Sequence, residues 1–237
     1  MPRKPATPTI TQFLTRFKTK AAIIAVSKLK CKHGRSFIDH YRCYERAYPT
    51  AAEAAAPERI GVMDLECSGL QSDYSQLLTW VILDSATGEV YKDQITPSDI
   101  RSGIEDRRIV ASLIEAMKSF TLLCGHYSTR FDIPYIRARA LIHGLEFPPY
   151  GSIKHFDTYF LCRSKFKLSS RRLDNLARFL LGKSDKTRVD ARYWRDGLRG
   201  DPKAIRYILD HNRKDVVMTE KLYNAIVKFK RPTATSI

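Results

Sequence analysis

The sequence Met63-Asp64-Leu65-Glu66-Cys67-Ser68-Gly69-Leu70 places two carboxylates at the end of a short apolar run that starts at Ile60. The run has the length and composition of a β-strand, and Gly69 follows it as a breaker. Residues two apart on a strand point to the same side, so Asp64 and Glu66 lie together and repel each other unless a cation separates them. Because Mg²⁺ prefers oxygen ligands, the pair predicts a divalent metal site. The alternative is a solvated strand end with two ordinary acids.

Composition favours a folded protein with a polyanionic partner. The chain has 237 residues, of which 43% are hydrophobic, and it carries 41 Lys and Arg against 25 Asp and Glu. The formal net charge of +16 favours nucleic acid as partner, with an anionic membrane surface as the second choice. No apolar run is long enough for a membrane span. The five scattered cysteines indicate reduced thiols, so we expect a cytoplasmic protein.

The positive charge is concentrated near the N-terminus. The first 50 residues contain eleven Lys and Arg against two acids, and the Ala-rich residues 51–57 indicate a linker. We therefore predict a basic helical extension with its linker over residues 1–57, one domain over residues 58–230, and a tail over residues 231–237.

The pattern after residue 57 is that of one α/β domain. Five strands are expected, over residues 60–65, 76–83, 90–95, 121–124 and 152–158. Short turns join the first three, which indicates antiparallel pairing, whereas helices separate the later ones. The expected helices cover residues 105–120, a segment that opens at Asp132, residues 173–181, and residues 202–228 with a break near Asn212. This order predicts a mixed five-stranded sheet with helices on both faces.

Two later segments could complete a metal site beside the first strand. Asp132 opens a helix just after the fourth strand, where it can meet the first strand's end, although helix capping alone would also explain it. His211 and Asp215 are four residues apart and share one helix face, which is either part of the site or a solvated surface. Four carboxylates around two cations about 4 Å apart can clamp both oxygens of a phosphodiester displacement. His211 would then stand beside the attacking water as a general base.

Together these residues resemble the DEDD 3′–5′ exonucleases of the ribonuclease H-like fold. The motifs that carry the likeness are Asp64-Leu65-Glu66 with Ser68-Gly69-Leu70, Phe131-Asp132-Ile133-Pro134-Tyr135, and Asp215-Val216. His155-Phe156-Asp157 and the segment from Leu173 to Gly182 look like the proofreading domains of family B DNA polymerases. Similar segments occur in stand-alone predicted exonucleases of bacteria and phages. The resemblance spans about residues 59–228.

The resemblance implies a ribonuclease H-like fold and two divalent cations, Mg²⁺ or Mn²⁺, in a site that cuts DNA or RNA. The metal ligands it implies are Asp64, Glu66, Asp132 and Asp215. His211 matches the residue that positions or activates water. It stands four residues before Asp215, which is the spacing of the tyrosine branch of the family, so a general base and a water-orienting group both remain open. For the rival acids Asp157 and Asp174, structural roles are expected.

Nucleic acid with a free 3′ end is the expected substrate. Tyr127 stands where many relatives carry an asparagine ahead of the second motif, so contacts to the terminal nucleotide are expected to involve it. The basic residues expected to contact phosphates near the site are Arg130, Lys165, Arg171 and Arg172.

The basic extension carries Cys31, His33, His40 and Cys43, which are residue types that bind Zn²⁺. Their spacing of one, six and two intervening residues matches no common zinc finger. Zinc binding is one interpretation, and a packed turn in which Cys43 and Tyr44 touch the main domain is the other. The Lys and Arg around them form either a nucleic-acid-binding surface with interleaved aromatic residues or a solvated basic tail.

We therefore expect a metal-dependent 3′–5′ exonuclease. An endonuclease specific for nucleic-acid structure, or a ribonuclease, on the same fold is the first alternative. The second is a nucleic-acid-binding module whose acids do not act together. Acids at all four motif positions favour the enzyme.

Overall fold

The computed structural model describes residues 13–14, 20–47, 58–184 and 190–230. Contacts within the chain divide it into two compact units, Met1–Pro57 and Glu58–Ile237. The predicted linker over residues 51–57 and the predicted tail over residues 231–237 lie outside the described residues. Among the helices in the described ranges, none is both long and apolar enough to cross a membrane.

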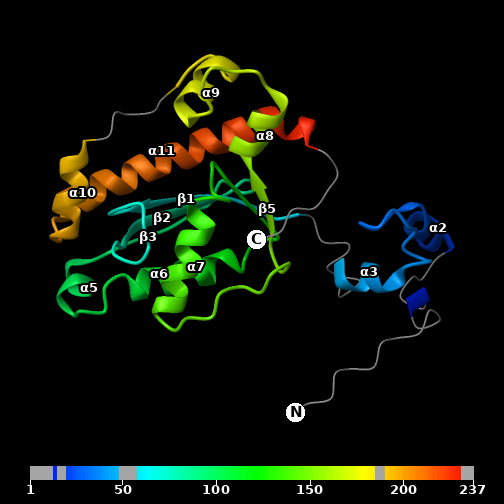
Figure 1. The fold of residues 1–237 in the computed structure, drawn as a ribbon, viewed down its shortest axis with the longest axis horizontal. Coiled ribbons are helices and arrows are strands. Elements are labelled where there is room, and N and C mark those ends of the chain that lie inside the picture. The colour runs from blue at the N-terminus through cyan, green and yellow to red at the C-terminus, as the bar shows by residue number, and fades with distance from the viewer. Residues whose placement is uncertain (1–12, 15–19, 48–57, 185–189, 231–237) are drawn as a thin grey trace, which may run out of the picture. The chain divides into compact units, whose positions relative to one another are not determined.

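The second unit is built on one five-stranded sheet with the strand order β3-β2-β1-β4-β5 (Figure 1). Its strands are β1 (Ile60–Cys67), β2 (Leu77–Asp84), β3 (Val90–Gln94), β4 (Leu122–Gly125) and β5 (Lys154–Asp157). The first three pair antiparallel, whereas β4 runs parallel to β1 and β5 parallel to β4. This mixed sheet confirms the predicted fold class.

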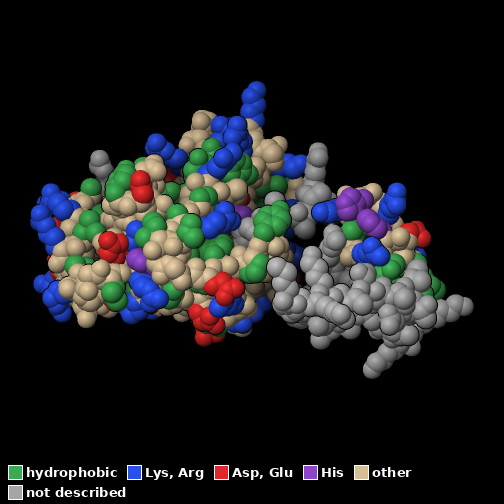
Figure 2. All heavy atoms as spheres, turned by 60° about the horizontal axis from the view of Figure 1, so that its bottom comes forward, with side chains coloured by type: hydrophobic (Ala, Val, Ile, Leu, Met, Phe, Trp, Pro, Cys, Tyr) green, Lys and Arg blue, Asp and Glu red, His purple; other side chains and the backbone are tan. Residues whose placement is uncertain are grey.

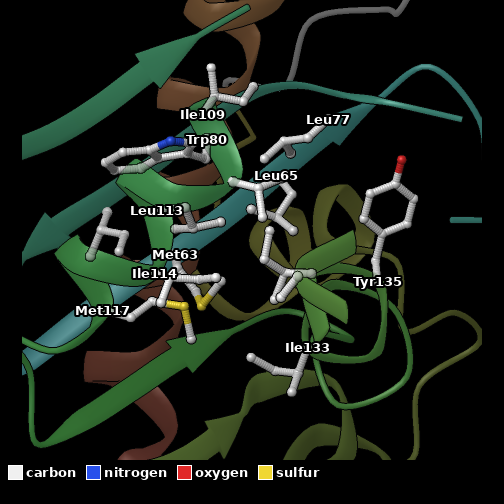
Figure 3. Packing of buried hydrophobic residues seen from close by; sticks show 14 of the residues in the cluster. Met63, Leu65, Leu77, Trp80, Ile109, Leu113, Ile114, Met117, Ile133 and Tyr135 are labelled. Carbon is white, nitrogen blue, oxygen red and sulfur yellow. The ribbon is translucent and has the colours of Figure 1, made fainter. Parts of the chain in front are cut away.

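Helices cover both faces of the sheet (Figure 1). Helices α6 (Arg107–Met117) and α7 (Asp132–Ile142) lie on one face, and α11 (Pro202–Ile226) crosses the other. In Figure 3, Met63 and Leu65 of β1 lie among apolar side chains of α6 such as Leu113. Val62 belongs to a second cluster with Val216 of α11. Because side chains alternate along a strand, Asp64 and Glu66 share the α11 side of β1 with Val62.

The predicted break in the last helix is wrong, because α11 is one continuous helix of 25 residues. It begins after Asp201, whose side chain accepts from the N–H of Lys203, and Pro202 occupies the first turn. Asn212 does not interrupt it, because its side chain is fully buried and bonds to the sheet rather than to its own helix backbone.

Shorter helices complete the second unit, and three of them were not predicted. They are α5 (Pro97–Arg101), α8 (Thr158–Lys165), α9 (Leu173–Leu180) and α10 (Ala191–Leu198), followed by the 3₁₀ turn η1 (Val227–Phe229). Of these, only α9 was expected, and it ends just before Gly182, which has a φ of +78°. Caps start α8 and α10, where Asp157 accepts from Tyr159 and Asp190 from Arg192.

The first unit contains helices α2 (Lys20–Lys28) and α3 (Tyr41–Ala47). The segment between them folds back on itself through an isolated antiparallel bridge between Lys30 and Ser36. Among its described residues, a small apolar core contains Phe13, Val26, Cys31, Phe37 and Tyr44. Tyr44 is therefore buried among apolar residues of its own unit.

Candidate active site

The acids of β1 meet α11 at a compact cluster. The Nε2 atom of His211 lies 3.8 Å from Oε1 of Glu66 and 3.8 Å from Oδ2 of Asp215. His211 is 4% exposed and Asp215 is 6% exposed, so α11 turns both toward the sheet. The alternative of a solvated helix face is therefore wrong. Since one potential ligand atom from each of the three residues lies within 4.8 Å of the others, this cluster can hold a metal ion.

Asp64 is tied to the same helix through Asn212. The Nδ2 of Asn212 donates a hydrogen bond of 3.1 Å to Oδ2 of Asp64. Asn212 is fully buried, and a buried side-chain amide needs partners of this kind. Sequence reasoning missed this residue as part of the site. The available signal was an amide, a weak helix former, placed directly after His211 within a long helix.

Asp132 is held against the middle of the β1 acid pair. Pairing between β1 and β4 ends at Val62 opposite Cys124, so β1 continues past its neighbour. There the backbone N–H of Leu65 donates 3.2 Å to Oδ1 of Asp132. Asp132 is the first residue of α7 and is 3% exposed, and Phe131 occupies the N-cap position without a side-chain cap bond. Helix capping therefore does not account for Asp132.

Burial, together with the smaller effect of the nearby charge of Asp157, raises the pKa of the Asp132 carboxyl to about 7. A buried carboxyl of this kind favours the protonated state until a cation compensates its charge. The donor set fits a hard divalent cation, because carboxylate oxygens from β1 and α11 converge and carboxylates are the ligands that Mg²⁺ and Mn²⁺ prefer.

The loop that leads from β4 to Asp132 is held by Asp157. Its carboxylate accepts from the backbone N–H groups of Tyr127 at 3.0 Å, Thr129 at 2.9 Å and Tyr159 at 2.9 Å. The Tyr127 backbone adopts a φ of +66°, a conformation that costs a non-glycine residue about 1–3 kcal/mol. The bonds of Asp157 maintain this conformation. Asp157 thus has the structural role that was predicted.

Asp174, the other rival acid, lies on the surface of α9. Its Oδ2 pairs with the guanidinium of Arg178 at 3.1 Å, four residues later on the same helix. Such exposed pairs contribute little to stability. Asp174 therefore makes an ordinary surface contact within its own helix, which agrees with the structural role expected for it.

The predicted nucleic-acid contacts fall into two groups. Tyr127 is 43% exposed, and its ring packs on Tyr159 and Phe160 with centroid distances of 4.7 and 6.1 Å. Arg130, Lys165 and Phe160 line one groove of about 710 Å³. Arg171 and Arg172 are not among its lining residues. The carbonyl of Arg171 instead accepts from Nε2 of His126, 3.0 Å away.

A second group of acids in the same unit is structural. Glu105, Asp106 and His143 could hold an ion by geometry alone, but the buried guanidinium of Arg139 lies among them. Asp106 also accepts from Nε2 of His143 at 2.7 Å and from the N–H of Leu77 at 2.6 Å. Its charge is therefore already compensated, and the cluster holds α7 against α6 and β2.

Solved structures and a family model agree with this architecture, whereas none of the curated proteins matches the chain. Among solved structures, the fold is similar to the family B DNA polymerase from the hyperthermophilic archaeon Pyrobaculum calidifontis, with a TM-score of 0.60 and 18% sequence identity. The likeness covers 73% of this chain and 25% of the polymerase chain. A family model described as the RNase H superfamily matches residues 62–227, well over half of the chain. The chain therefore belongs to the RNase H superfamily.

Proposed function

We propose that this protein is a metal-dependent 3′–5′ exonuclease that hydrolyses phosphodiester bonds of DNA or RNA. One observation carries the proposal: the residues that match the exonuclease motifs come from three distant parts of the chain, β1, the start of α7 and the middle of α11, and meet at β1. Glu66 meets His211 and Asp215, Asn212 bonds Asp64, and Asp132 bonds the backbone between the two β1 acids.

Asp64, Glu66, Asp132 and Asp215 would hold two divalent cations, Mg²⁺ or Mn²⁺. When bound, these cations would supply Lewis-acid stabilisation of the charge that develops on the scissile phosphate and the leaving oxygen. His211 acts next to them, as a base for the proton of the attacking water or as the group that orients this water. The Nε2 atom of His211 lies 3.8 Å from a carboxylate oxygen of Glu66 and 3.8 Å from one of Asp215, so its side chain stands next to the acids that would hold the cations.

Two hollows of the second unit that are lined by Lys and Arg support a nucleic-acid substrate. Arg130 and Lys165 line the groove beside the Tyr127 ring stack, which offers an exposed aromatic face to a base. A second hollow of about 690 Å³ is lined in part by α11, the helix that carries His211. Its basic lining residues are Lys183, Arg213, Lys214 and Lys221. Such grooves can follow a phosphate backbone.

The alternatives make different predictions for different substrates. We would incubate the purified protein with 3′-labelled linear strands of DNA and RNA and with circular single strands, each with Mg²⁺, Mn²⁺ or a chelator. An exonuclease degrades only linear strands, and only with metal. Cleavage of circles favours the endonuclease, and no metal-dependent cleavage of any strand favours the binding module.

Matched variants assign the activity to this site. Asp64→Ala should lower the rate by at least about 10²-fold, because it removes a carboxylate that would hold the cations, which stabilise charge in the transition state. Asp174→Ala removes a surface acid of α9 and should retain the wild-type rate. Equal rates for Asp64→Ala and wild type would place the activity elsewhere.

A further inference from the structure

Four metal-ligating side chains gather in the first unit. The Sγ of Cys31 lies 3.3 Å from Nδ1 of His40 and 3.7 Å from Nδ1 of His33, and the Sγ of Cys43 lies 3.4 Å from the same Nδ1 of His33. One potential ligand atom of each residue lies within 4.8 Å of all the others. Both cysteines are free thiols.

These separations match the edges of a tetrahedral zinc site. With Zn–S bonds of about 2.3 Å and Zn–N bonds of about 2.0–2.1 Å, the sulfur and nitrogen ligands of a tetrahedron are roughly 3.5 Å apart. The three sulfur–nitrogen distances bracket this value, at 3.3, 3.4 and 3.7 Å. An ion at the centre would need only small adjustments of the side chains.

The backbone explains how an unusual spacing produces this cluster. The N–H of Cys31 donates to the carbonyl of Arg35 at 2.8 Å, and the N–H of Gly34 donates to the carbonyl of Cys31 at 2.9 Å. Gly34 has a φ of +75°, which favours glycine, and the resulting tight turn carries both Cys31 and His33. Cys43 lies in the first turn of α3, and its N–H donates to the carbonyl of His40 at 2.9 Å. The turn and the helix start thus supply two ligands each.

The described residues of the first unit bury only a small apolar core. The apolar cluster in its described residues has five buried members, and one of them is Cys31 itself. Units with so little apolar burial usually need a metal, a disulfide or a partner. Two thiols and two imidazoles at contact distance are a ligand set for such a metal.

We propose that Cys31, His33, His40 and Cys43 bind one Zn²⁺ in a closed tetrahedral site that stabilises the N-terminal unit. The site is separate from the acids of the second unit and does not depend on the proposed nuclease activity. It orders a strongly basic surface: in Figure 2 the histidines of this unit lie together at the surface with Lys and Arg beside them. The exposed basic residues around the ligands are Lys28, Lys30, Lys32, Arg35 and Arg42.

Metal analysis of the full-length protein tests the proposal. Protein purified with reducing agent and passed through a brief wash with chelator should retain about one zinc per chain by elemental mass spectrometry. After exchange with Co²⁺, it should show the visible bands of a tetrahedral ion and charge-transfer bands from two thiolates. The wild-type cobalt spectrum needs no variant, so it does not depend on whether a variant folds.

Variants locate the ion. The double substitution Cys31→Ser and Cys43→Ser should lose the zinc, whereas Cys67→Ser and the double substitution Asp64→Ala and Asp215→Ala should retain it. His33→Cys should keep the zinc and raise the cobalt–thiolate absorption by about half, because a third thiolate replaces an imidazole. Absence of zinc from the wild type, zinc that persists in the double cysteine variant, or a Cys31–Cys43 disulfide in the purified protein would overturn the proposal.

Discussion

The carboxylate of Asp132 accepts a hydrogen bond of 3.2 Å from the backbone N–H of Leu65, the residue between Asp64 and Glu66. This bond places the start of α7 against the acid pair of β1 at the point where β4 no longer pairs with that strand. Open α/β sheets build their sites outside the carboxyl ends of the strands, where the strand order reverses. Asp132 is thereby held in place before any cation binds.

The raised pKa of Asp132 predicts a pH-dependent stability. The pKa of this carboxyl is about 7 in the folded protein and about 4 in an unfolded chain, so folding favours its protonated form. The contribution of Asp132 to the free energy of unfolding therefore decreases as pH rises from about 4 to about 7 and is constant above that. Saturating Mg²⁺ should remove the decrease in the free energy of unfolding as pH approaches 7, because a bound cation stabilises the Asp132 carboxylate.

Thermal unfolding against pH, with chelator and with Mg²⁺, measures this effect. In Asp132→Asn the titrating group is absent, so the difference in melting temperature between this variant and wild type should change across the same pH window. A difference that stays constant from about pH 5 to about pH 8 would contradict the assignment.

Asn212→Ala should weaken metal binding without removing a metal ligand. Asn212 holds Asp64 by a hydrogen bond of 3.1 Å, and loss of such a supporting contact typically costs 10–100-fold in metal affinity. Titration of the cleavage rate with Mg²⁺ would show a higher half-saturating concentration. Asn175→Ala is the matched control, since its side chain bonds the carbonyl of Ser170 beside α9. An unchanged Mg²⁺ requirement in Asn212→Ala would show that Asp64 needs no support.

His211→Ala should separate chemistry from metal binding. Loss of a general acid–base group typically lowers the rate by about 10²–10⁴-fold, whereas the four carboxylates remain to bind the cations. Calorimetric titration with Mg²⁺ should therefore give similar affinities for the variant and the wild type. His211→Gln tests the role: a group that only orients water can be replaced by an amide, but a base cannot. Loss of metal binding in His211→Ala would instead make His211 a ligand.

Charge removal in the groove should reduce the salt dependence of binding. Each phosphate contact to a single strand contributes about 0.7 to the slope of log affinity against log salt concentration. Arg130→Ala and Lys165→Ala should each reduce the slope by up to this amount, because both side chains line the groove next to Tyr127. Lys118→Ala, at an exposed pair with Glu115 after α6, is the control. Equal slopes for all variants would exclude this groove as the nucleic-acid path.

The sheet and its two covering layers could be predicted because they follow from local patterns. Alternation along β1 and the buried run of β2 indicate strands in any context, and the amphipathic pattern of α6 indicates a helix. Two pairs of the candidate site could be predicted for the same reason. Asp64 and Glu66 are two residues apart on a strand, and His211 and Asp215 are four residues apart on a helix, so each pair shares one face.

Features that depend on distant partners could not be predicted in this way. Asn212 was interpreted as a helix breaker because its partner, Asp64, lies in another part of the chain. Helices α8 and α10 are only eight residues long, so a helical pattern has little length in which to show in the sequence. The distances among Cys31, His33, His40 and Cys43 depend on a tight turn at Gly34, which spacing alone does not reveal.

The polarity of degradation tests the central claim most directly. A 5′-labelled single strand with Mg²⁺ should give a ladder that shortens by one nucleotide at a time from the 3′ end. The same strand with an inverted 3′-terminal nucleotide should remain intact, and Asp64→Ala should leave both intact. Products of one internal length, or equal cleavage of the blocked strand, would contradict the assignment of a 3′–5′ exonuclease.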